Sequence, residues 1–253
     1  MTQQIHIYFH QQLNEFLPLE QRETRFDYEL KPPRSAKDLI EAIGVPHVEV
    51  DLIIVNGDSV DFNYLVQAGD QISVYPVSTL IDEKLTISPL KHCQPPALRN
   101  SRFVLDVHLG RLAAYLRMLG FDCLYRNDYE DPTLANISVD ENRILLSCDR
   151  QLLMRKNVNH GYFVRSRQPR RQLIEILTRF ELFEKQKPFS RCMRCNGKIH
   201  PVEKLAIAER LSDATKKYYD EFYICEDCEN LYWKGSHYLK MIKMIETLRP
   251  EKQ

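Results

Sequence analysis

No apolar run in the sequence approaches the ~20 residues that a membrane-spanning helix needs. The first ten residues, MTQQIHIYFH, also lack the basic start and the long apolar segment of a secretory signal peptide. These two absences argue against the membrane and secreted classes and predict a cytoplasmic location. The chain has 253 residues, of which 43% are hydrophobic, which suffices for one or two domains with a packed core.

The number of cysteines in the chain is odd. In a reducing compartment, seven cysteines favour metal binding over disulfides. Four of them form two C-x-x-C pairs, Cys192 with Cys195 and Cys225 with Cys228, which 29 residues separate. Four thiolates in a tetrahedral array select Zn²⁺ and leave no position for a substrate, so we predict a structural zinc; the alternative is two unrelated thiol pairs. The isolated cysteines are Cys93, Cys123 and Cys148.

The chain also lacks net charge, but its two parts differ. Residues 1–90 hold 6 Lys/Arg and 14 Asp/Glu and sum to −8, so residues 91–253 sum to +8. Residues 143–171 hold 8 Lys/Arg and one acid, Asp149. This basic stretch suits a polyanionic substrate, although a solvated basic face is equally compatible with it. Because opposite charges attract, we expect the N-terminal part to lie against the basic part.

Aspartates follow short apolar runs in the centre of the chain. Residues 103–105 (FVL) lead to Asp106, and residues 144–146 (ILL) lead to Asp149. An acidic segment that includes Asp131 lies between them. Ligands bind at the carboxyl ends of strands in open α/β sheets. Gathered carboxylates repel one another unless a cation lies between them, and such oxygen ligands suit Mg²⁺ or Mn²⁺. We therefore predict a divalent-metal site.

Apolar residues at helical spacing in 109–119 and 173–180 alternate with the apolar runs. This alternation predicts a parallel sheet with helices on both faces. Asp131 precedes a proline and is therefore as compatible with helix capping as with catalysis. Arg111 and Arg117 lie six positions apart, about 120° around a helix, so one can contact phosphate and the other a carboxylate. The candidates for phosphate contacts are Arg111, Arg117 and Arg150.

The first 77 residues read as strand, strand, helix, strand, strand. Ser35 is a candidate N-cap, Gly44 ends the helical pattern, and Asn56-Gly57 is a hairpin signal. This order and the segment NGDSVDFNYLVQAGDQISVYP resemble the ubiquitin-like β-grasp fold and its sulfur-carrier branch. A sulfur carrier needs a free C-terminal Gly-Gly, whereas here the last strand continues into further chain. The resemblance therefore implies a structural or docking role and a protein partner.

The remaining chain resembles the Mut-seven C-terminal RNase family. The resemblance rests on FVLDVHLGRLAAYLRMLGFDCLYRND, NRILLSCDRQLL, GYFVRSRQPRRQLIEIL and SRCMRCN, in that order. It implies a PIN-like nuclease domain with an appended zinc ribbon, and it assigns catalysis to Asp106, Asp131 and Asp149 with Mg²⁺ or Mn²⁺. Ser147-Cys148 replaces the usual threonine-containing strand end. A fourth acidic residue cannot be assigned, because the segment that follows the last strand, Arg165-Ser166-Arg167, contains no carboxylate.

These observations predict an α/β protein of four parts. They are a ubiquitin-like β-grasp domain over 1–77, a linker over 78–100, a PIN-like domain over 101–187 and a zinc ribbon with a C-terminal helix over 188–253. The predicted function is metal-dependent hydrolysis of RNA. Because a fourth acid is missing, a non-catalytic RNA-binding module is one alternative. An assembly adaptor that acts through the β-grasp domain is another.

An aromatic and basic segment, YWKGSHY, follows the second cysteine pair at residues 232–238. Aromatic rings beside cations can stack nucleobases. Packing beside a zinc knuckle is the more common role of a single tryptophan in such a place.

Overall fold

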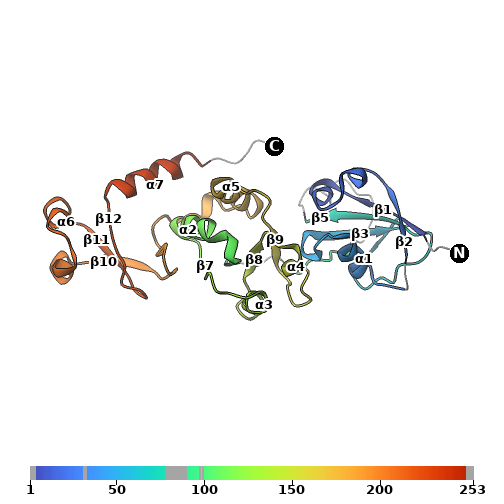
Figure 1. Cartoon of the computed structure of the whole chain (residues 1–253), viewed down its shortest axis with the longest axis horizontal. Helices are drawn as coiled ribbons and strands as arrows, with labels where there is room; N and C mark the ends of the chain where they lie inside the picture. The colour runs from blue at the N-terminus through green and yellow to red at the C-terminus, as the bar shows by residue number, and fades with distance from the viewer. Residues whose placement is uncertain (1–3, 31–32, 78–89, 97, 99, 249–253) are drawn as a thin grey trace. The chain divides into compact units, whose positions relative to one another are not determined.

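The computed structural model describes residues 4–30, 33–77, 90–96, 98 and 100–248. Most of the predicted linker lies outside these residues. The chain divides into two compact units, residues 1–99 with 130–163 and residues 100–129 with 164–253. Figure 1 colours the chain from blue at the N-terminus to red at the C-terminus. None of the described helices is both long and apolar enough to cross a membrane.

The first unit contains a five-stranded mixed sheet in the order β2-β1-β5-β3-β4. β1 and β5 pair in parallel, and the other neighbours are antiparallel. The elements are β1 (Gln4–Phe9), β2 (Phe26–Glu29), α1 (Ala36–Ile43), β3 (Val50–Val55), β4 (Asp58–Val60) and β5 (Gln71–Pro76). This is the predicted β-grasp arrangement with one additional short strand, β4.

Local chemistry fixes the ends of these elements. The Ser35 side chain accepts a hydrogen bond from the Asp38 backbone N–H at 3.1 Å and donates one to its carboxylate at 2.8 Å, which is the predicted cap of α1. Gly44 ends the helix at φ +109°, a left-handed conformation that suits glycine. Asn56 and Gly57 both have positive φ, as a tight hairpin turn between β3 and β4 requires.

Residues 130–163 complete the first unit. They form α3 (Asp131–Asp140), β8 (Ile144–Ser147), α4 (Arg150–Leu153) and β9 (Gly161–Phe163), with β8 and β9 parallel. The Glu49 carboxylate accepts a hydrogen bond from the Phe163 N–H at 2.7 Å. His47 Nε2 lies 2.8 Å from the Val158 carbonyl oxygen. The ubiquitin-like residues therefore contact part of the basic 143–171 stretch.

The second unit begins with β6 (Phe103–Leu105), a 3₁₀ turn (Val107–Leu109), α2 (Gly110–Met118) and β7 (Cys123–Leu124), and later adds α5 (Pro169–Arg179). β6 and β7 are parallel. Each unit thus holds one parallel strand pair, β8 and β9 in the first unit and β6 and β7 in the second, in agreement with the predicted parallel sheet with helices. Gly110 lies where a Cβ would be 2.6 Å from the Tyr125 hydroxyl, so only glycine fits there without displacing that ring.

The second unit ends in an antiparallel three-stranded ribbon in the order β10-β11-β12. Its strands are β10 (Ile199–Val202), β11 (Phe222–Cys225) and β12 (Leu231–Trp233). The helices α6 (Asp213–Tyr218) and α7 (Ser236–Glu246) flank β11 and β12 in the sequence. Phe222, Ile207 and Leu211 form a small apolar cluster of the ribbon.

Candidate functional site

The four predicted zinc ligands come together in the ribbon. Their sulfur atoms all lie within 4.8 Å of one another, with Cys192 3.6 Å from Cys228 and Cys195 3.3 Å from Cys225. A tetrahedral zinc with Zn–S bonds of ~2.3 Å needs sulfur separations of about 3.8 Å. Both the donor type and the spacing of this cluster fit zinc.

The electrostatics of the cluster also suit a cation. Burial raises the pKa of Cys192, but hydrogen bonds from the Tyr232 hydroxyl and from backbone groups outweigh burial and lower this pKa to about 7. Burial and the neighbouring thiols raise the pKa values of Cys195 and Cys228. Ionising several crowded thiols is unfavourable unless a cation neutralises them. The arrangement is therefore compatible with a zinc ribbon.

Tight turns hold the first cysteine pair. Asn196 has φ +80°, and the Cys192 N–H donates to the Gly197 carbonyl oxygen at 2.7 Å. The Gly197 N–H points to the Cys195 sulfur at 3.4 Å, and a Cβ on Gly197 would lie 2.8 Å from the Cys225 sulfur. The second pair has a similar turn, in which the Cys225 N–H donates to the Asn230 carbonyl oxygen at 3.1 Å.

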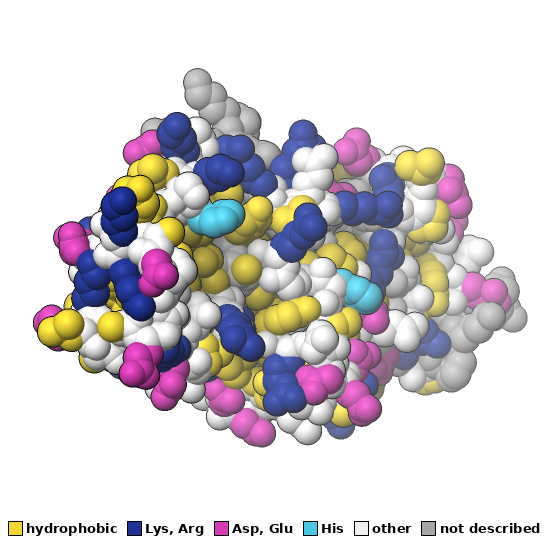
Figure 2. All heavy atoms as spheres, turned by 60° about the vertical axis from the view of Figure 1, so that its left-hand side comes forward, with side chains coloured by type: hydrophobic (Ala, Val, Ile, Leu, Met, Phe, Trp, Pro, Cys, Tyr) yellow, Lys and Arg dark blue, Asp and Glu magenta, His cyan; other side chains and the backbone are white. Residues whose placement is uncertain are grey.

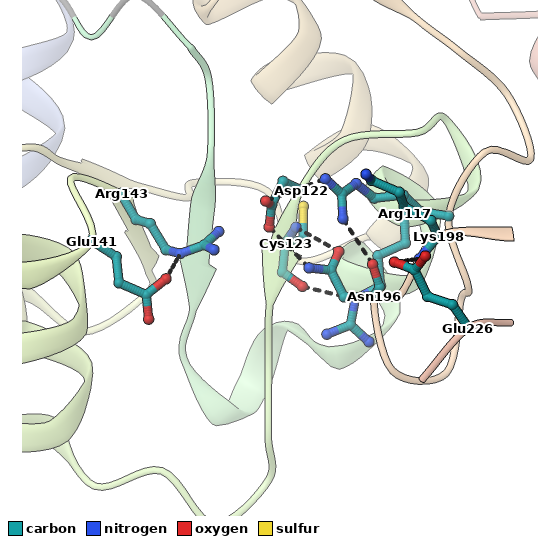
Figure 3. A network of polar contacts seen from close by, with 9 residues as sticks. Arg117, Asp122, Cys123, Glu141, Arg143, Asn196, Lys198 and Glu226 are labelled. Atoms are coloured by element: carbon teal, nitrogen blue, oxygen red, sulfur yellow. Dashed lines mark hydrogen bonds and ion pairs between the residues drawn. The ribbon is translucent and has the colours of Figure 1, made fainter. Parts of the chain in front are cut away.

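Arg117 on α2 links β7 to the first cysteine turn, and Figure 3 shows its side chain beside Cys123. Its side chain is only 3% exposed. Nε donates to the Cys123 carbonyl oxygen at 2.8 Å, and Nη1 donates to the carbonyl oxygens of Met193 and Arg194 at 3.3 and 3.0 Å. Burial lowers the pKa of Arg117, and nearby thiols and Asp122 oppose this effect.

Asn196 makes the same connection from the cysteine side (Figure 3). Its amide donates to the Asp122 carboxylate at 2.9 Å and accepts from the Cys123 N–H at 2.9 Å. Arg191 also reaches Asp122, at 3.3 Å. Buried backbone carbonyls surround the Arg117 guanidinium and hold the cysteine turn. These contacts compete with the predicted phosphate contact of Arg117, which stays a prediction.

We expect Arg117→Met to destabilise the second unit by at least about 3 kcal/mol, because it leaves buried carbonyl groups without their charged donor. Urea unfolding followed by circular dichroism measures the change. Arg111→Met is the matched control, since Arg111 is exposed on the same helix and should change stability by less than about 0.5 kcal/mol. Equal stabilities of the two variants would contradict the structural role of Arg117.

The three predicted catalytic aspartates lie at strand and helix ends. Asp106 follows β6, is 4% exposed and accepts a hydrogen bond from the His108 N–H at 2.7 Å. Asp149 follows β8, is exposed and caps α4 by accepting from the Gln151 N–H at 2.7 Å. Asp131 and Asp149 belong to the first unit and Asp106 to the second. The backbone hydrogen bonds to Asp106 and Asp149 fix the rotation of these two carboxylates.

The start of α3 differs from the prediction by one residue. Glu130, rather than Asp131, occupies the N-cap position, and Asp131 lies in the first turn before Pro132. Among the residues that the structure describes, the exposed carboxylate of Asp131 has no hydrogen-bond partner. Asp131 is thus an acidic residue in the first turn of α3, where the helix dipole favours a carboxylate, and its catalytic role stays a prediction.

Arg150 contacts the ubiquitin-like residues. Its Nη1 donates to the Phe16 carbonyl oxygen at 2.8 Å, and the guanidinium lies 5.0 Å from the Phe16 ring centroid and 5.9 Å from that of Phe163. Cation–π contacts of this kind stabilise by about 0.5–2 kcal/mol. This contact competes with the predicted phosphate contact, so Arg111 is the exposed member of the three candidates.

One carboxylate near residues 165–167 was not predicted from the sequence. Glu175 on α5 accepts hydrogen bonds from the backbone N–H groups of Arg165 at 2.9 Å and Ser166 at 3.1 Å. A carboxylate thus reaches the segment after β9, but from a helix rather than from the strand end. Both of its oxygens bind backbone amides, which makes it an anchor for this turn.

Comparisons with known proteins agree with this architecture. Residues 101–245, more than half of the chain, match the family model described as the Mut7-C RNAse domain. Residues 2–82 match the model described as Mut7-C ubiquitin. Searches of curated proteins and of solved structures gave no match.

Proposed function

Since the chain belongs to the Mut7-C RNAse domain family, we propose that it is a metal-dependent ribonuclease that hydrolyses RNA phosphodiester bonds. The family match over residues 101–245 carries this proposal, because that range includes the three strand-end and helix-start aspartates. Their oxygen donors are those that Mg²⁺ and Mn²⁺ prefer in proteins.

Asp106, Asp131 and Asp149 are the residues that would hold this metal. When bound, the metal would lower the pKa of a coordinated water and offset negative charge on the phosphoryl oxygens. The backbone N–H groups of His108 and Gln151 each bind Oδ1 of the preceding aspartate and so orient both carboxylates before a metal arrives. Such preorientation reduces the reorganisation that binding requires.

The direct test is to incubate the purified full chain with mixed RNA and Mn²⁺ and to follow the RNA by gel electrophoresis. Cleavage that needs the metal supports the proposal. If wild-type protein and Asp149→Asn protein leave the same pattern of RNA, the proposed activity is wrong.

A structural zinc on Cys192, Cys195, Cys225 and Cys228 is part of the same proposal. The sulfur separations support this zinc site. The four cysteines also complete the tetrahedral coordination of zinc, which leaves no position for substrate. Zinc would thereby stabilise the ribbon without entering the hydrolytic chemistry.

A protein partner for the ubiquitin-like domain is a second proposal, which the Mut7-C ubiquitin match supports. Leu19 and Leu65 are 79% and 61% exposed on this domain. Apolar side chains with this exposure suit contact with another protein. An adaptor role without catalysis remains the alternative to the nuclease, and the RNA cleavage assay separates the two.

The contacts of Arg150 with the ubiquitin-like residues lead us to expect a role in stability, whereas its sequence position predicted a phosphate contact. We expect Arg150→Met to reduce stability by about 1–3 kcal/mol, because it removes a charged hydrogen bond and the cation–π contacts. The salt dependence of RNA binding should stay unchanged. Arg111→Met is the matched comparison and should reduce the slope of log K against log salt by about 0.7, the value for one phosphate contact to a single strand. Reversed results for the two variants would return Arg150 to the phosphate-binding set.

A further inference from the structure

A cavity of about 250 Å³ lies in the second unit where the ribbon sheet faces α7. Tyr223 and Tyr232 are cross-strand partners on β11 and β12, so their side chains project from the same face of the ribbon. Tyr238 and Met241 line the cavity from one face of α7, three positions apart. Trp233 and Lys234 complete this side of its lining.

The helix leaves the cavity open. Within the described residues of α7, none is buried, although the helix carries apolar side chains along one face. Phe189 packs on Tyr238 with ring centroids 4.8 Å apart, and this contact holds the helix at one side of the cavity. Trp233 is 38% exposed. A preformed cavity with exposed aromatic groups is thus available to a ligand of small volume.

Basic groups accompany these rings. Arg191 and Lys234 line the cavity. The Arg191 guanidinium is held in place by Asp122 and by the Asn196 carbonyl oxygen at 2.9 Å. Figure 2 brings the ribbon side forward and shows Lys and Arg side chains around exposed hydrophobic ones. Aromatic faces beside cations are the combination by which proteins bind single-stranded nucleic acids.

We propose that this cavity binds one base of single-stranded RNA by stacking, with Lys234 contacting a neighbouring phosphate. The inference rests on the proposed function for its choice of RNA, and it assigns substrate binding to the ribbon rather than to the aspartates. A volume of about 250 Å³ is below the ~300 Å³ at which pockets for drug-sized ligands begin, so it suits a single base better than a folded segment.

One acid opposes this assignment and also offers a test of it. Lys234 Nζ pairs with the Glu221 carboxylate at 2.5 Å, and the two side chains are 50% and 66% exposed. An exposed ion pair contributes little stability, so an RNA phosphate can replace Glu221. Removing Glu221 should therefore strengthen RNA binding, whereas removing Lys234 should weaken it.

Trp233 is the single tryptophan of the chain and reports directly on the cavity. The full-length Asp149→Asn protein without Mg²⁺ or Mn²⁺ is titrated with a short oligouridylate and with an abasic oligomer of the same length and charge. We expect the oligouridylate to quench the tryptophan fluorescence and to bind about 5- to 100-fold more tightly than the abasic oligomer, the range that stacking of one base gives.

Two pairs of variants test the residues, with zinc content and thermal unfolding as controls for folding. Tyr223→Leu should weaken oligouridylate binding about 5- to 100-fold, while Tyr218→Leu, a change of a 70% exposed tyrosine outside the cavity, should not change it. Glu221→Gln should strengthen binding more than Asp213→Asn does. Asp213 pairs with Lys216 at 3.8 Å, so this control removes the same charge from an ion pair outside the cavity.

The outcomes separate this inference from the nuclease proposal. If quenching depends on the bases but the wild-type chain cleaves no RNA, base binding in the cavity is supported and the nuclease proposal is wrong. Equal binding of the two oligomers without quenching overturns the cavity, whether or not the wild-type chain cleaves RNA. Equal effects of Tyr223→Leu and Tyr218→Leu overturn it as well.

Discussion

Asp149→Asn is expected to reduce RNA cleavage by about 10³-fold or more, because loss of a metal-binding carboxylate removes several kcal/mol of transition-state stabilisation. The fold should survive. Asn is as good an N-cap as Asp and can accept the same hydrogen bond from the Gln151 N–H, so α4 keeps its start. Asp106→Asn should behave in the same way, since its amide oxygen can accept from the His108 N–H. Cleavage rates with Mn²⁺ are measured beside thermal unfolding for each variant.

Asp140→Asn is the matched control for this series. Asp140 ends α3 and is exposed, so the change removes the same charge without touching a proposed ligand. We expect wild-type cleavage from it. If Asp106→Asn and Asp149→Asn both retain wild-type activity, the assignment of these aspartates to the metal is wrong. Loss of activity together with loss of the unfolding transition would indicate damage to the fold instead.

Sequence patterns predicted the features whose chemistry is local. Ser35, Gly44 and the Asn56-Gly57 turn lie where their own backbone preferences place them, so the ubiquitin-like elements could be predicted from residues a few positions apart. The two C-x-x-C pairs likewise indicated their own cluster, because each pair closes a short turn around one metal position.

The partners of the arginines could not be predicted in this way. Arg117 binds carbonyl groups 76 and 77 positions away, and Arg150 binds one 134 positions away. A helical pattern shows that an arginine is off the apolar stripe, but it does not show whether another segment covers that face. Glu175 was missed for a related reason, since the prediction looked for a carboxylate at a strand end and the structure supplies one from a helix.

Cys192→Ser is expected to remove most of the bound zinc and to unfold the ribbon. Structural zinc contributes an apparent binding energy of about 10–16 kcal/mol in small zinc peptides, and this energy is available for folding. The purified wild-type chain should carry one zinc per molecule by elemental analysis. Cys148→Ser is the matched control, because Cys148 is an exposed thiol outside the cluster, and its zinc content should equal that of the wild type.

The effect of zinc loss should spread beyond the ribbon along the contacts of Arg117 and Asn196. The Cys123 N–H donates to Asn196, and the Cys123 carbonyl oxygen accepts from Arg117, so both backbone groups of this β7 residue depend on the cysteine turn. We therefore expect faster amide hydrogen exchange at Cys123 in Cys192→Ser than in Cys148→Ser. Unchanged zinc content in Cys192→Ser would sink the zinc assignment. Zinc loss with unchanged exchange at Cys123 would instead show that the cysteine turn keeps its shape without the metal, because Arg117 and Asn196 suffice to hold it.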